Sequence, residues 1–83
     1  MHTVITFSDS SEIKLTLHDT LSPICYENGL SCLGAKESVE WNVHNGLIPY
    51  LLTFFKKHDY FFINDEQNVV YNSKSVIKIE TFL

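Results

Sequence analysis

Cys25 and Cys32 are the residues of this chain best suited to chemistry, and they lie symmetrically about the pair Asn28-Gly29. A cysteine thiolate can bind zinc, form a disulfide or act as a nucleophile. Zinc sites usually take four ligands with short spacings inside each cysteine pair, whereas six residues separate these two. The C-x-x-C spacing of redox proteins is absent as well, so the spacing alone assigns no chemistry to the pair.

The other soft metal ligands of the chain are its four histidines: His2, His18, His44 and His58. A Cys2His2 site would need His18 and His44 to converge on Cys25 and Cys32, and these four residues are only weak candidates for such a site. A cross-strand disulfide between the cysteines is geometrically feasible, although a reducing compartment disfavours it. The simplest interpretation is that both cysteines are small, partly buried apolar residues. We therefore expect neither a metal nor a cofactor.

Catalytic patterns are missing from the rest of the sequence. No glycine-rich phosphate loop occurs, and nothing specifies a nucleophile with a base and an oxyanion hole. His18 and Asp19 are neighbours, but on a strand their side chains would point apart. Paired carboxylates such as Glu37 and Glu40 fall in expected turns or on solvated faces. We therefore expect a protein that is not an enzyme.

Composition restricts the class of protein and its partners. With 83 residues, of which 45% are hydrophobic, the chain is expected to form one small globular domain over residues 1–83. Six lysines, no arginine and a net charge of −4 disfavour direct binding to nucleic acid. The longest apolar stretch, residues 47–55, is far shorter than the ~20 residues that span a bilayer, and no signal-peptide pattern is present. We expect a cytoplasmic protein without a membrane partner, and an excess of residues with AT-rich codons points to a low-GC bacterium or its phage.

Alternating apolar residues near the N-terminus predict a first hairpin. Ile5 and Phe7 can share a face with Ile13 and Leu15 only if the connecting loop has an odd length. We therefore expect a loop at residues 9–11, with Phe7 opposite Ile13 and Ile5 opposite Leu15.

The pair Asn28-Gly29 predicts a second hairpin, because a type I′ turn needs positive φ at both central residues. This turn places Cys25 directly opposite Cys32, and Ile24 opposite Leu33. The two cysteines are then neighbours on one face of a β-ribbon.

The middle of the chain changes from a strand pattern to a helix pattern. Residues 38–44 alternate, with Val39, Trp41 and Val43 expected to point inward from a strand. Apolar residues at helical spacing then predict a single α-helix over residues 47–58.

The last third of the chain returns to strands. A third hairpin is predicted from strands at residues 60–64 and 69–72. A final strand is predicted over residues 75–82, in which Ile77 and Ile79 alternate with Lys78 and Glu80. Strand-rich segments on both sides of a single helix indicate an α+β fold. We expect a hairpin-rich antiparallel sheet of about five to seven short strands, with the helix packed on one face.

Aromatic residues of the third hairpin are the candidates for partner binding. In the predicted pairing, Tyr60, Phe62 and Tyr71 share one face, which is either covered or exposed as an aromatic patch. Exposed aromatic patches usually mark protein interfaces, so we expect these residues to contact another protein or a second copy of the chain. The leading hypothesis is a small acidic protein-binding or regulatory domain that can form a homodimer. The alternatives are an acidic inhibitor that mimics nucleic acid and a Cys/His metal-binding module.

Overall fold

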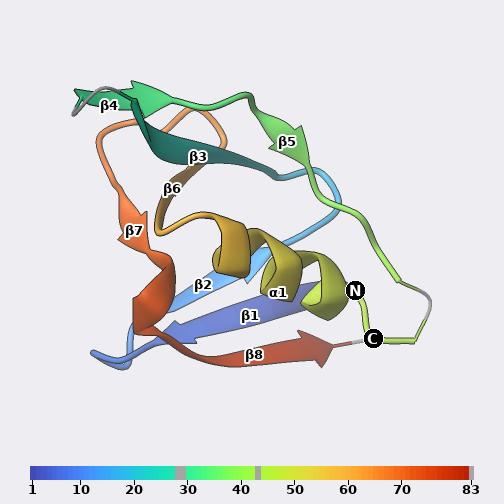
Figure 1. The fold of residues 1–83 in the computed structure, drawn as a ribbon. Helices are drawn as coiled ribbons and strands as arrows, with labels where there is room; N and C mark the ends of the chain where they lie inside the picture. Colours follow the sequence, from blue (N-terminus) through green and yellow to red (C-terminus); the bar gives the residue numbers. More distant parts are fainter. Residues whose placement is uncertain (28–29, 43, 83) are drawn as a thin grey trace.

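The computed structural model describes the backbone of residues 1–27, 30–42 and 44–82, and the side chains of the same ranges except those of residues 25–33. The described residues form antiparallel strands in two sheets, one α-helix and a short 3-10 helix (Figure 1). In chain order the elements are β1 (His2–Phe7), β2 (Glu12–Leu15), β3 (Thr20–Glu27), β4 (Leu30–Leu33), β5 (Glu37–Ser38), α1 (Ile48–Lys57), β6 (Tyr60–Ile63), β7 (Tyr71–Asn72), η1 (Ser73–Ser75) and β8 (Val76–Phe82).

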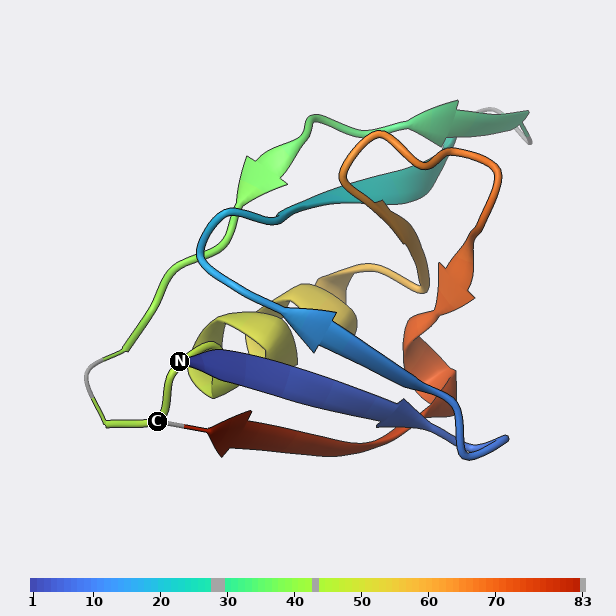
Figure 2. The same ribbon diagram turned by 180° about the vertical axis from the view of Figure 1, so that it is seen from behind.

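The strands are divided between two sheets. The first sheet has the strand order β2-β1-β8, and the second has the order β4-β3-β6-β7, with β5 also paired to β3. Helix α1 lies in front of the first sheet in Figure 1 and behind it in the reverse view of Figure 2, so the helix covers one face of this sheet. The predicted α+β fold, with one helix packed on an antiparallel sheet, is therefore confirmed.

Helix α1 lies within a core that both sheets share. Leu51 and Phe54 are its buried residues, and the Phe54 ring meets Phe61 of β6 edge to face, with 5.8 Å between ring centroids. Phe55 and Tyr71 pack against the same Phe61 ring at 5.3 and 5.5 Å. Aromatic pairs of this kind contribute about 0.5–1.5 kcal/mol beyond the burial of their area. The other buried apolar side chains of this core come from both sheets and from loops: Ile5, Phe7, Leu15, Leu21, Val39 and Leu47.

The helix begins and ends within one residue of the predicted range 47–58. Leu47 is its N-cap residue, and His58 follows its last turn in extended conformation. Pro49 lies in the first turn, where its missing N–H breaks no helical hydrogen bond. Two lysines in the last turn favour the negative end of the helix dipole.

The first hairpin has a loop of odd length, as predicted, but the register is different. The loop is Ser8-Asp9-Ser10 rather than residues 9–11, and Ile5 lies opposite Ile13 rather than Leu15. The predicted register is therefore wrong by two residues. A shift of two preserves the face of every side chain, so Ile5 and Leu15 are both fully buried all the same.

The conformation of Ser10 explains this register. Ser10 has φ 73° and its N–H donates to the Phe7 carbonyl at 2.9 Å, which is the common three-residue loop built from a turn and a left-handed residue. The Asp9 carboxylate accepts hydrogen bonds from the backbone N–H and the hydroxyl of Ser11. These bonds hold the pKa of Asp9 below its ordinary value.

The second hairpin has the predicted pairing. Cys25 lies opposite Cys32, and Ile24 lies opposite Leu33, between β3 and β4. The turn residues Asn28-Gly29 and both cysteine side chains lie outside the described part of the structure. The backbone register of this ribbon is therefore confirmed.

Among the described residues 38–42 and 44, the predicted strand is not formed, and β5 ends at Ser38. The Asn42 side chain accepts hydrogen bonds from the backbone N–H groups two and three residues further on, and Asn42 forms an isolated bridge with Gly46. These local hydrogen bonds compete with a strand ladder. Val39 is buried as predicted, whereas Val43 lies outside the described residues.

The third hairpin is present but shorter than predicted. β6 ends at Ile63 and β7 begins at Tyr71, so a loop over residues 64–70 replaces the predicted four-residue turn. Asn64 starts this loop in left-handed conformation, with φ 55°.

A β-bulge changes the orientation of one residue of β8. Thr6 of β1 lies opposite Lys78, but the next residue of β1 lies opposite Val76, so Ile77 is the extra residue. Ile77 is consequently 66% exposed, whereas Ile79 packs against the core, so the predicted alternation is interrupted at Ile77.

Candidate functional site

The aromatic face predicted for the third hairpin is not formed. Tyr71 lies opposite Phe61, and residues directly opposite share a face, so Tyr71 is on the other face from Tyr60 and Phe62. Tyr71 packs against the core, and Phe62 is only 5% exposed. Tyr60, opposite Asn72, is 38% exposed. The prediction of one shared surface is therefore wrong, while a contact between any of the three residues and a partner remains a prediction.

The weak metal candidates are not brought together by the residues that the structure describes. His18 lies in the turn before β3 and His44 in the turn after Asn42, and both are exposed. Within the described side chains, no three His, Cys, Asp or Glu residues are grouped as a metal site would require. Because the side chains of Cys25 and Cys32 lie outside that part, their role stays at the level of the sequence prediction.

A polar cluster joins helix α1 to β5. The Tyr50 hydroxyl donates a 2.9 Å hydrogen bond to Glu37 Oε1, and Glu37 Oε2 lies 3.7 Å from His58 Nε2. Burial, together with this hydrogen bond and the negative charge of Glu37, raises the pKa of Tyr50 above its ordinary value. Tyr50 is therefore a firmly protonated donor, which suits it to bracing the helix against the second sheet.

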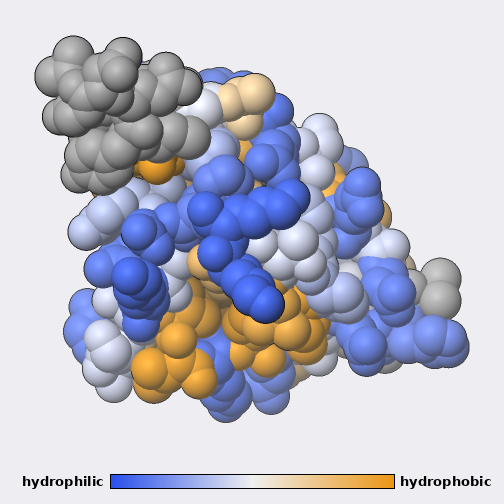
Figure 3. Space-filling view, in the orientation of Figure 1, coloured by the Kyte–Doolittle hydropathy of each residue, from blue (hydrophilic) through white to orange (hydrophobic). Residues whose placement is uncertain are grey.

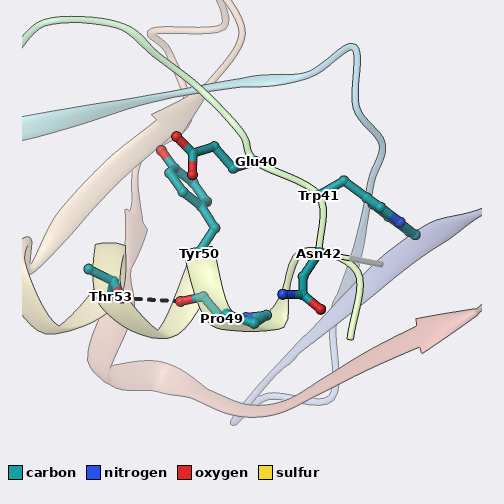
Figure 4. Close-up of a pocket in the computed structure, with 6 residues that line it drawn as sticks. All are labelled: Glu40, Trp41, Asn42, Pro49, Tyr50 and Thr53. Atoms are coloured by element: carbon teal, nitrogen blue, oxygen red, sulfur yellow. Dashed lines mark hydrogen bonds between the residues drawn. The ribbon is translucent and has the colours of Figure 1, made fainter. Parts of the chain in front are cut away.

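An open cleft of about 340 Å³ lies beside Tyr50. Figure 4 shows Glu40 close to Tyr50, whereas Trp41 points away from them. Small-molecule sites usually gather a few polar groups toward one point in an apolar cavity. The side chains that line this cleft do not converge in that way, so it is a poor basis for a function.

A second cleft, of about 370 Å³, lies between helix α1 and β8, and we name it the α1–β8 groove. Leu52 is 58% exposed on the helix side, and Ile77 at the bulge is the most exposed apolar residue on the strand side. Figure 3 shows apolar side chains gathered over α1 and the start of β8. The groove is lined by Ile48, Leu52, Phe55, Ser73, Val76, Ile77, Lys78 and Ile79.

The spacing of the helix residues explains the groove. Ile48, Leu52 and Phe55 are four and three residues apart and form one stripe, next to the buried stripe that contains Leu51 and Phe54. Ile48 and Leu52 therefore widen the apolar face of the helix beyond the stripe that the fold buries. The width of this face along the sequence was the signal from which an exposed apolar stripe could have been predicted.

Comparison with protein-family models gives no match to this chain, and comparisons with curated proteins and with solved structures give none either. In the described residues, the one α-helix is too short to cross a membrane. The candidate function is therefore argued from the geometry of the site.

Proposed function

We propose that this chain is a small, non-enzymatic protein-binding domain whose contact surface is the α1–β8 groove. The observation that carries the proposal is the apolar lining of the groove, with Leu52 and Ile77 each more than half exposed. A solvent-exposed apolar groove costs free energy in an isolated protein, and such patches usually serve as interfaces.

The partner is another protein or a second copy of the chain. The net charge of −4 and the absence of arginine argue against nucleic acid as the partner. Through this contact the domain would act as a regulatory or accessory protein, in the cytoplasm of a low-GC bacterium or its phage.

The test replaces one leucine in the groove and one outside it. Leu52→Asp places a charge in the groove, while Leu17→Asp places the same charge at a leucine that is 52% exposed and lines a different cleft. Both substitutions are at exposed sites and should leave folding nearly unchanged. The first measurement is whether the immobilised protein retains a stoichiometric partner protein. Self-association of the chain is measured separately by sedimentation.

We expect the original chain and Leu17→Asp to retain the same partner, and Leu52→Asp to lose it. Equal retention by all three proteins would contradict the proposal, because the contact would then lie elsewhere. The absence of any partner, including a second copy, would contradict it too.

A further inference from the structure

Strand β8 forms one edge of the first sheet among the described residues. β8 is the outermost strand of the first sheet, paired with β1 on one side. In the part of the chain that the structure describes, no strand pairs with its other side. An edge strand offers unpaired N–H and C=O groups that readily take up another strand.

We infer that β8 pairs antiparallel with β8 of a second copy of this chain, with Ile79 opposite Ile79 at a two-fold axis. This inference rests on the proposed function and deepens it, because it names the partner and the register of the contact.

Symmetry leaves few registers for such a pair. Two identical antiparallel strands are related by an axis normal to the sheet, so the residue at the axis lies opposite itself. The bulge at Ile77 confines regular pairing to the stretch from Lys78 to Phe82. The axis must therefore pass beside Lys78, Ile79, Glu80 or Thr81.

Charge selects one of these registers. An axis at Lys78 places two lysines opposite each other, and an axis at Glu80 places two glutamates opposite each other, and like charges in that position are destabilising. An axis at Thr81 leaves Glu80 opposite the apolar Phe82 of the second copy. Only the axis at Ile79 sets Lys78 of each copy opposite Glu80 of the other, which is stabilising.

The two faces of β8 fit this register. Ile79 lies opposite the buried Ile5 on the helix-covered face, while Lys78 and Glu80 lie opposite Thr6 and Val4 on the outer face. The shared interface would thus have an apolar isoleucine pair on its helix side. Its charged pairs would lie on the solvent side.

The same axis brings the two α1–β8 grooves together. An axis normal to the sheet keeps both copies of α1 on one face of a continuous sheet, and α1 packs on β8 within each copy. Paired strands lie ~4.8 Å apart, and each groove lies directly beside its β8, so the groove of each copy would adjoin the second copy. Pairing of the two β8 strands would then cover Leu52 and Ile77 of both copies.

The test uses charge reversals of Lys78 and Glu80, which in the single chain form a 3.3 Å ion pair along the exposed edge. Lys78→Glu and Glu80→Lys each place like charges opposite one another in the dimer, twice because of the symmetry. We expect either variant alone to dissociate about tenfold more readily than the original chain, measured by sedimentation equilibrium.

A mixture of the two single variants separates the contact between copies from the pair within a copy. In the mixed dimer an all-acidic strand faces an all-basic one, so we expect association to return, although the ion pair within each chain is still lost. Thermal unfolding of each variant at low concentration is the control for monomer stability. A mixture that associates no better than its components would overturn the inference.

The outcome is distinguishable from failure of the proposed function. A chain that sediments as a monomer at every concentration, yet retains a different protein that Leu52→Asp loses, overturns this inference and leaves the proposed function standing. A dimer that is insensitive to both charge reversals but lost with Leu52→Asp also overturns the β8 register alone. A monomer with no groove-dependent partner overturns both.

Discussion

Asn64 donates a 3.0 Å hydrogen bond from its side-chain amide to Asp19 Oδ1, joining the turn before β3 to the loop after β6. The other Asp19 oxygen accepts from the backbone N–H of Thr16 at 2.7 Å. Asn64 also forms two hydrogen bonds with Thr20. The backbone N–H of Thr20 donates to Asn64 Oδ1, and the backbone N–H of Asn64 donates to the Thr20 carbonyl. Two residues far apart in the sequence therefore fix how β3 and β6 enter the second sheet.

Asp19 should make the stability of the protein depend on pH. Partial burial raises the pKa of Asp19, but the hydrogen bonds from Asn64 and Thr16 outweigh it, so the pKa lies below its ordinary value. A carboxylate with a lowered pKa contributes stability above its unfolded pKa of about 3.9, and this contribution is lost as the pH falls through the folded pKa. Urea unfolding measures the free energy of unfolding at each pH. Between pH 6 and pH 3, we expect this free energy to fall less in Asp19→Asn than in the original chain. Glu12→Gln, on the exposed β2 edge, is the control, and an equal loss in all three proteins would contradict the prediction.

Gly46 is required by both its conformation and its surroundings. It has φ 61°, and a Cβ atom there would lie 2.7 Å from Thr81 Cγ2. We expect Gly46→Ala to lower the free energy of unfolding by about 2 kcal/mol or more, since a left-handed alanine alone costs about 1–2 kcal/mol. Urea denaturation measures the loss. In the double variant Gly46→Ala/Thr81→Ser, the clashing methyl group is absent, so part of the stability should be recovered. Strictly additive effects of the two substitutions would show that this contact is not the cause of the loss.

Substitutions of Phe62 and Tyr60 should lower the stability of the protein by very different amounts. Phe62 is nearly fully buried, so Phe62→Ser should lower the free energy of unfolding by about 3–5 kcal/mol. Tyr60 is 38% exposed, so Tyr60→Ser should cost about 1 kcal/mol or less. Thermal melts of both variants check the prediction. A Phe62→Ser protein as stable as the original chain would contradict it.

The hydrogen bond between Tyr50 and Glu37 should be a measurable brace of the helix. Because Glu37 is partly exposed, we expect Tyr50→Phe and Glu37→Gln each to cost about 0.5–1 kcal/mol. A double-mutant cycle should give a coupling energy between the two, and Tyr60→Phe removes an exposed hydroxyl as the control. Additive single effects would mean that the bond does not stabilise the fold.

The elements that the sequence predicted well are those that local physics defines. The helix follows from apolar spacing and from Pro49 at its start, and the pairing of Cys25 with Cys32 follows from Asn28-Gly29. In each case the decisive residues are close together in the sequence. The odd length of the first loop was predictable for the same reason, through the parity of its flanking residues.

The errors arose where several local solutions were equally consistent with the pattern. A two-residue shift of the first hairpin preserves every face, so alternation could not distinguish the two registers, and the left-handed Ser10 decided between them. The prediction of the third hairpin was wrong for a different reason. Its loop was longer than predicted, and this placed Tyr71 on the face of Phe61.

The sequence by itself determined the fold class, the single amphipathic helix and the lack of a recognisable catalytic pattern, because these depend on periodicity and on residue types. The tertiary structure alone decided which apolar stripe of the helix would be covered, that β8 would carry a bulge and form an edge, and that Leu52 and Ile77 would meet in one groove. Burial is a property of what packs against a side chain from elsewhere in the chain. A pattern along the sequence can therefore predict an apolar face, but it cannot show whether the fold provides enough surface to cover it.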